Sequence, residues 1–149
     1  MATTIYFSGA ISGGRADVAS YRKIVDALEA DGHRVLAGAV AAEHVGAGGE
    51  TLLPADIYAR DIGWLDESDL VVAEVSMPSL GVGYEIAYAT RVRRIPVIAL
   101  YRNAFTKRCS AMIGGDAGVT LLEYETLDAV LPRLLESIRT SRRYPDRFP

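Results

Sequence analysis

Two short runs of the sequence, LVVAEV at 70–75 and IPVIALY at 95–101, are apolar at nearly every position. Strands with consecutive apolar residues are typical of parallel sheets, because helices cover both faces of such sheets. Further strands are predicted at 3–7, 33–36 and 119–124, and longer segments separate all five. The alternation predicts an α/β domain, with a three-layer, doubly wound five-stranded parallel sheet of the flavodoxin-like or Rossmann-like kind.

The helices expected between these strands have apolar residues at helical spacing, and residues typical of helix ends lie at their boundaries. They are predicted from Asp17 to Gly32, from Pro54 to Glu67, over 83–93 and from Thr126 to Ile138. Asp17 and Thr126 are residue types that cap helix N-termini, and glycine is common just beyond a C-terminus. The segment 37–53 is rich in Gly and Ala without periodicity and is predicted to be a long loop.

The chain has 149 residues, enough for one ordinary domain, predicted at 1–138 and followed by an arginine-rich tail at 139–149. A net charge of −3 argues against a nucleic-acid-binding protein. No apolar run approaches the roughly 18 residues of a membrane span. The first strand follows without a basic leader, so no membrane partner and a cytoplasmic location are predicted.

Metal and thiol chemistry have little support in the sequence. The chain contains one cysteine, Cys109, and two histidines, His33 and His44. This number of ligands is too small for a thiolate metal site or a histidine zinc centre, so no metal is predicted. By itself Cys109 is expected to be a partly buried apolar residue and His44 a surface residue.

Ligands of doubly wound sheets bind beyond the carboxyl ends of the strands. After the first strand, residues 8–15 read SGAISGGR, with Gly9 and Gly14 spaced as in a phosphate loop. Arg15 stands where that motif requires lysine, which makes a nucleoside triphosphatase improbable. The segment is either an anion-binding turn before a helix N-terminus or a tight turn with a solvated arginine.

The segment after the third strand has a second potential anion site, where Ser79, Gly81 and Gly83 lie near a helix start. Glu85 is expected in the first turn of that helix, which is otherwise apolar and should pack on the sheet. Its alternative role is purely electrostatic, because a carboxylate in a first turn is favoured by the helix dipole.

A second carboxylate, Asp61, shares an apolar stripe with Ile57 and Leu65 and therefore needs a partner or a function. Tyr6, inside the first strand, could direct its hydroxyl to the same crevice as Glu85. Two carboxylates and a tyrosine suit glycosidic chemistry, in which one carboxylate attacks an anomeric carbon and another group transfers protons.

Four stretches together resemble the nucleoside 2-deoxyribosyltransferase superfamily. They are IYFSGAISGGR at 5–15, AEHV at 42–45, RDIGWLDESDLVVAEVSMPSLGVGYE at 60–85 and SAMIGG at 110–115. Within it the chain is most similar to the Rcl branch, the 2′-deoxynucleoside 5′-phosphate N-hydrolases. This resemblance implies that the chain cleaves the N-glycosidic bond of a (deoxy)nucleoside 5′-monophosphate, without a cofactor.

The resemblance also implies roles for the matching residues. Glu85 would attack C1′ and form a covalent glycosyl intermediate, Tyr6 would orient Glu85, and Asp61 would contact the sugar and assist proton transfer to the departing base. Groups implied at the 5′-phosphate are Ser79, Gly81 and the first loop with Gly9, Ser12, Gly13 and Arg15. Met112, His44 and Ile11 would lie near the base. Ser110 would complete the phosphate site from the other subunit of a homodimer.

One position departs from the branch, whose members carry arginine in the phosphate loop where this chain has Ser12. Losing that charge-assisted contact would weaken phosphate binding by about 1.5–3 kcal/mol unless Arg15 or Arg102 compensates. Two alternatives stay open: a transferase that passes the deoxyribosyl group to another base, and a non-catalytic flavodoxin-like module that binds FMN or a nucleotide.

Overall fold

A computed structural model describes residues 2–11, 17–37, 51–103 and 108–141 of the chain. The described residues form a five-stranded sheet in which every strand pairing is parallel. The strands are β1 (Thr4–Gly9), β2 (Arg34–Leu36), β3 (Leu70–Glu74), β4 (Val97–Arg102) and β5 (Val119–Tyr124), in the spatial order β2-β1-β3-β4-β5. This is the predicted flavodoxin-like order, and its switch point lies between β1 and β3.

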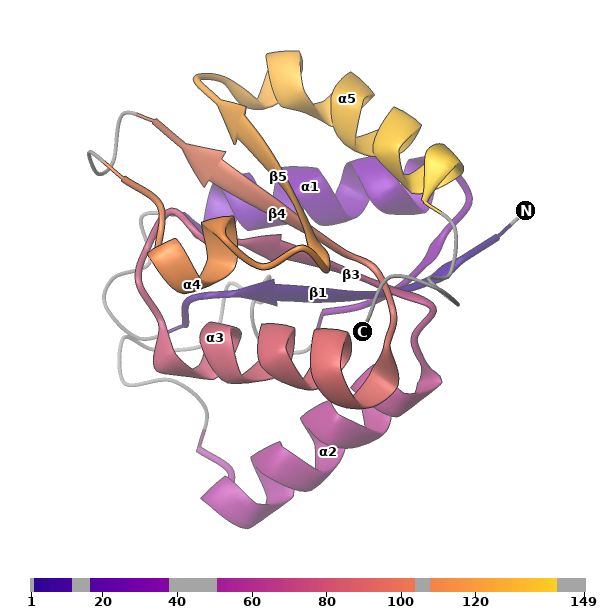
Figure 1. Ribbon diagram of the computed structural model, residues 1–149. Coiled ribbons are helices and arrows are strands. Elements are labelled where there is room, and N and C mark those ends of the chain that lie inside the picture. Colours follow the sequence, from indigo (N-terminus) through magenta and orange to yellow (C-terminus); the bar gives the residue numbers. More distant parts are fainter. Residues whose placement is uncertain (1, 12–16, 38–50, 104–107, 142–149) are drawn as a thin grey trace.

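Helices cover both faces of the sheet (Figure 1). On one face lie α1 (Val18–Ala30) and α5 (Leu127–Thr140). The other face carries α2 (Pro54–Glu67) and α3 (Leu80–Ala87), which continues as the π-helix η1 (Tyr88–Arg93). A four-residue helix, α4 (Ala111–Gly114), lies beside α3 on this second face. The three predicted layers are therefore present.

Alternating strand side chains divide the core into two parts. Ile5 and Phe7 of β1 point toward α1 and α5, whereas Tyr6 between them joins the cluster under α2 and α3. Because successive side chains of a strand face opposite sides, every second residue of β1 belongs to the same face as Tyr6. This alternation decides which strand residues can reach a side chain of α3.

The start of α3 differs from the prediction. The helix begins at Leu80, three residues before the expected start, and the Ser79 hydroxyl oxygen caps it by accepting a hydrogen bond from the Val82 amide at 3.3 Å. Glu85 therefore lies in the second turn, and its expected place in the first turn was wrong. A dipole effect confined to the first turn cannot account for this carboxylate.

Asp17 precedes α1 as expected, but its side chain makes no capping hydrogen bond. The carboxylate instead accepts a hydrogen bond from the Arg102 guanidinium at 2.7 Å, an ion pair between the start of α1 and the end of β4. At the other end, Gly32 has a φ of 90°, the left-handed conformation that glycine adopts without strain. Thr126 caps α5 as predicted, by accepting from the Ala129 amide.

The last helix extends through Thr140, so the first two residues of the predicted tail continue α5. Arg139 pairs there with Asp31 at 2.9 Å. The predictions for Ser12, Gly13, Arg15 and His44 fall outside the described residues, as do residues 142–149 of the tail. Among the helices of the described part, none is long and apolar enough to cross a membrane.

Candidate active site

The carboxylate of Glu85 reaches from α3 to the sheet and meets two hydroxyl groups of β1. Tyr6 donates a hydrogen bond to Oε1 at 2.9 Å, and Ser8 donates one to Oε2. The two donors are two residues apart on one strand, so both face α3. Ser8 is fully buried and Tyr6 is 3% exposed. The carboxylate is thus held at both oxygens, next to the switch point of the sheet.

Burial is the main influence on the charge of Glu85. It raises the pKa of the Glu85 carboxyl, and the Asp61 carboxylate raises it further, whereas the hydrogen bonds from Ser8 and Tyr6 and the charge of Arg60 lower this pKa. Burial and the Glu85 and Asp61 carboxylates also raise the pKa of Tyr6 far above its ordinary value, so the phenol keeps its proton and remains a donor. A partly desolvated carboxylate with two fixed donors is suited to act as a nucleophile or a base.

Asp61 has the partner that its place on an apolar stripe requires. Its Oδ1 accepts hydrogen bonds from Nε and a terminal nitrogen of Arg60, each at 2.9 Å. The Arg60 guanidinium in turn lies over the Trp64 ring, 4.9 Å from the ring centroid. Because Asp61 influences the pKa of both Tyr6 and Glu85, it belongs to the same electrostatic cluster.

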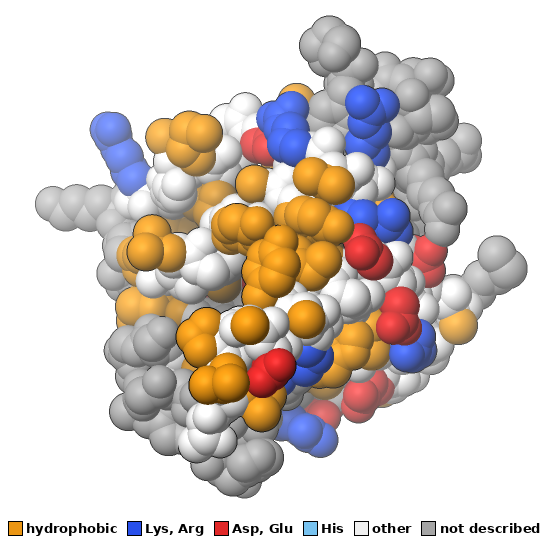
Figure 2. Space-filling model, turned by 90° about the horizontal axis from the view of Figure 1, so that it is seen from below, with side chains coloured by type: hydrophobic (Ala, Val, Ile, Leu, Met, Phe, Trp, Pro, Cys, Tyr) orange, Lys and Arg blue, Asp and Glu red, His pale blue; other side chains and the backbone are white. Residues whose placement is uncertain are grey.

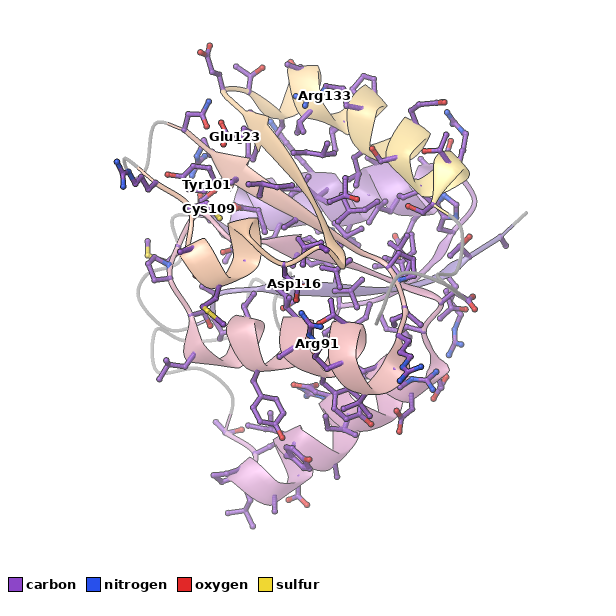
Figure 3. The ribbon with its side chains drawn as sticks, viewed as in Figure 1. Arg91, Tyr101, Cys109, Asp116, Glu123 and Arg133 are labelled. Carbon is purple, nitrogen blue, oxygen red and sulfur yellow. The ribbon has the colours of Figure 1, made fainter. Side chains whose placement is uncertain are left out.

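A second feature is a groove of about 890 Å³ between α3 and the segment that contains α4. Its walls include several residues that were predicted to contact the phosphate or the base. Ser79, Ser110 and Met112 of one chain all line it. Arg91 of η1 pairs with Asp116 across the groove at 3.1 Å, and Cys109 lies near Tyr101 at another part of its wall (Figure 3). Cys109 packs against the core and is partly buried, as predicted.

Glu85 does not line this groove. Val82, Gly83 and Ile86 face the groove, while Glu85 points to β1. Ser79 and the exposed Gly81 lie at the N-terminus of α3. Gly9 is the last residue of β1 and Ile11 follows it. These residues surround the carboxyl edge of β1 and β3.

Sequence reasoning missed two members of the cluster, Ser8 and Arg60. Ser8 was considered only as the start of the glycine-rich loop, although strand alternation from Tyr6 would have placed it on the same face. Arg60 gave no signal beyond its position next to Asp61. Arg102, considered as a replacement phosphate ligand, is paired with Asp17. Among the described residues, no group of three or more His, Cys, Asp and Glu could hold a metal ion.

Together the fold and the site define a flavodoxin-like α/β protein with a partly buried carboxylate at the carboxyl edge of its sheet. The family model described as nucleoside 2-deoxyribosyltransferase matches residues 5–128. The chain belongs to this family, as the resemblance implied.

Known relatives and solved structures agree with this membership. A protein of Syntrophotalea carbinolica, provisionally named a 2′-deoxynucleoside 5′-phosphate N-hydrolase, is 41% identical over 143 residues, which cover 95% of this chain and 98% of that protein. The human 5-hydroxymethyl-dUMP N-hydrolase is 40% identical over 140 residues, covering 89% and 79%. The structure of a Clostridium botulinum CMP N-glycosidase matches with a TM-score of 0.63 at 17% identity, covering 89% and 98%, which shows the shared fold.

Proposed function

We propose that the protein is an N-glycosidase that hydrolyses (deoxy)nucleoside 5′-monophosphates to the free base and (deoxy)ribose 5-phosphate. The observation that carries this proposal is the Glu85 carboxylate, partly buried and held by the hydroxyls of Tyr6 and Ser8. The relatives, about 40% identical and named as nucleotide N-hydrolases, support the substrate class.

In the proposed mechanism a Glu85 oxygen attacks C1′ of the sugar. The bond from C1′ to the base nitrogen breaks, its electron pair leaves with the base, and a glycosyl ester of Glu85 forms. Asp61 contacts the sugar and assists proton transfer to the departing base. Water then attacks C1′, loses a proton, and releases the sugar phosphate and the free carboxylate. No metal or cofactor takes part in this scheme.

The 5′-phosphate would lie at the N-terminus of α3 and the first loop. There the Ser79 oxygen accepts from the Val82 amide, and a hydroxyl that accepts a hydrogen bond still has its own proton to donate. Gly81 has room around it, since a Cβ built there meets its nearest atom, the Ser79 oxygen, only at 3.9 Å. Gly9, Ile11, Ser12, Gly13, Arg15 and His44 belong to the same proposal.

We also propose a homodimer in which Ser110 contributes to the phosphate site of the partner and Met112 approaches the base. Leu80 is 97% exposed and Met112 84% exposed, and both line the groove beside α3. Apolar side chains also gather on the molecular face seen in Figure 2. Large exposed apolar residues next to a groove support a protein contact. A cytoplasmic location belongs to the same proposal, because free nucleotides are kept inside cells.

Base exchange is the second candidate function, favoured by the description of the family model. Both reactions share the glycosyl ester, and they differ in whether water or an acceptor base resolves it. The non-catalytic flavin-binding alternative lacks support from the reported relatives, which are named as enzymes.

Incubation with each common deoxyribo- and ribonucleoside monophosphate, followed by chromatography, tests the proposal. The wild-type protein is expected to release free base, and Glu85→Ala to release none while still binding nucleotide. Addition of an acceptor base distinguishes the two reactions, since a transferase forms a new nucleotide. Base release by Glu85→Ala at the wild-type rate would exclude Glu85 as the nucleophile. If the wild-type protein cleaved no nucleotide, the proposed N-glycosidase activity would be excluded.

A further inference from the structure

We propose that Ser8 is a positioning residue for the reaction, whose hydroxyl holds the second oxygen of the Glu85 carboxylate in its reactive orientation and charge state. The inference rests on the proposed function, because it assumes that Glu85 is the reacting group. The two oxygens of the carboxylate have different donors, because Tyr6 donates a hydrogen bond to Oε1 and Ser8 donates one to Oε2.

Both donors stand on a strand that is paired on both sides. β1 pairs with β2 on one side and with β3 on the other. Tyr6 pairs in register with Leu36 and Val71, and Ser8 with Ala73. Their main-chain positions are therefore fixed by the sheet. The carboxylate is oriented by two points of this sheet, not by its own helix alone, which changes to a π-helix three residues after Glu85.

The packing around Ser8 separates the role of its hydroxyl from that of its volume. Ser8 pairs with Ala73, and Ala73 pairs with Ala99, so a row of small residues crosses three strands. Ala73 and Ala99 belong to the core part under α3, which is also the side that Ser8 faces. Small side chains in this row let α3 approach the sheet closely. Alanine at position 8 would continue the row, so packing alone does not require a hydroxyl there.

A hydroxyl in this buried place has a clear electrostatic effect. The groups that act on Glu85 are Tyr6 and Ser8 from β1 and Asp61 and Arg60 from α2. Burial and Asp61 favour the neutral carboxyl and raise its pKa, whereas the two hydrogen bonds and Arg60 favour the ionised form. Without Ser8, one oxygen of this partly buried carboxylate loses its donor, which costs more in the ionised form than in the neutral one.

The test compares wild type, Ser8→Ala, Ser8→Cys and the matched control Ser68→Ala. Ser68 is also buried, 2% exposed, and donates one hydrogen bond, to the Trp64 carbonyl at 2.7 Å, away from Glu85. We expect Ser8→Ala to lower kcat/KM about tenfold on the acidic side of the pH profile and to move the acidic limb to higher pH. The kcat/KM of Ser8→Cys, whose thiol is a weak donor, should lie between those of wild type and Ser8→Ala. Ser68→Ala should keep the wild-type pH profile.

A second readout does not depend on turnover. The Glu85 carboxyl carbon can be followed by NMR during a pH titration, with its signal assigned by its loss in Glu85→Gln. The midpoint is expected at higher pH in Ser8→Ala than in wild type and unchanged in Ser68→Ala. An unchanged midpoint and an unchanged acidic limb in Ser8→Ala would overturn the role of Ser8. Failure of the wild type to cleave any nucleotide would instead overturn the proposed function, while the titration would still test Ser8.

Discussion

At the scale of residues, Glu85 is a carboxylate that folding removes from water and then holds with two hydroxyl groups. The carboxylate is partly buried where α3 packs on β1, and Tyr6 and Ser8 each donate a hydrogen bond to it. Such a group is costly to bury in its ionised form and is more reactive for the same reason. The ionised Glu85 carboxylate is therefore expected to lower the stability of the fold and to be suited to catalysis.

This cost predicts a pH-dependent effect of Glu85→Gln on stability. The folded-state pKa of Glu85 is raised, so the native state binds its proton more tightly than the unfolded state does. The free energy of unfolding then falls as pH rises from the unfolded pKa through the folded one. Glu85→Gln is neutral at every pH, so it should unfold at a temperature roughly 2–4 °C higher than wild type at pH 7.

Thermal unfolding at a series of pH values checks this expectation. The advantage of Glu85→Gln should shrink below the unfolded pKa, where wild-type Glu85 is protonated in both states. The same variant should release no base. A Glu85→Gln protein less stable than wild type at pH 7, with equal stability at acid pH, would contradict the burial of a charged carboxylate.

At the scale of elements, α3 positions both parts of the proposed site. Its N-terminal cap, Ser79, lies beside the predicted phosphate position, and Glu85 follows six residues later on the side facing β1. Val82 and Ile86 of the same helix are buried in the core cluster that contains Tyr6, which fixes the rotation of the helix about its axis. One short helix thus sets the separation between the proposed phosphate ligand and the proposed nucleophile.

The two capped helices allow a matched test of Ser79. Ser79 and Thr126 each accept one hydrogen bond at 3.3 Å from an amide three residues ahead. Ser79→Ala and Thr126→Ala should each lower the free energy of unfolding by about 1 kcal/mol. In contrast, KM for nucleoside monophosphates should rise about tenfold in Ser79→Ala alone, because a phosphate hydrogen bond is lost.

Denaturant titrations and initial rates measure these two effects separately. Thr126→Ala controls for a general loss of helix stability. Equal KM values in the two variants would remove Ser79 from the phosphate site.

At the scale of the whole molecule, a partly or fully buried carboxylate lies on each face of the sheet. Glu85 lies on the face of α2 and α3, and Glu74 at the end of β3 belongs to the opposite side, where it is 1% exposed. Glu74 accepts a hydrogen bond from the Ser76 amide at 2.7 Å, and burial raises its pKa. Helices on both faces thus remove polar groups at the strand ends from water, as the doubly wound arrangement requires.

The proposed dimer predicts complementation between two inactive variants. If Ser110 acts across the interface, a mixed dimer of Glu85→Ala and Ser110→Ala chains contains one complete site, because one chain supplies Glu85 and the other Ser110. Mixing should then restore up to about half of the wild-type activity per mixed dimer at limiting substrate. If Ser110 acts within its own chain, neither site is complete.

Rates of the mixed and separate variants, with the molar mass from light scattering, provide the measurement. Wild type is expected at twice the chain mass of 16.1 kDa. Leu80→Glu should lower the mass toward one chain, whereas Val92→Glu, an exposed residue outside the groove, should leave it unchanged. A monomeric wild type with full activity would exclude the shared site.

Where the residues at the ends of an element and its buried positions favour the same bounds, the sequence predicted the first and last residue of that element correctly. Both 54–67 and 119–124 have the predicted bounds. The start of α3 was missed because Pro78, Gly81 and Gly83 have low helix propensity, whereas burial of Val82 and Ile86 favours an earlier start. The expected Asp17 cap failed because Arg102, 85 residues away, binds the carboxylate instead.

By itself the sequence determined the fold class and the family, since apolar runs, their spacing and four motifs are local properties of the chain. It also determined that Glu85, Asp61 and Tyr6 were the residues to examine. Only the tertiary structure decided which groups touch Glu85. Ser8 and Glu85 are 77 positions apart, and their contact exists because strand pairing and the small residues beneath α3 bring a helix and a strand together.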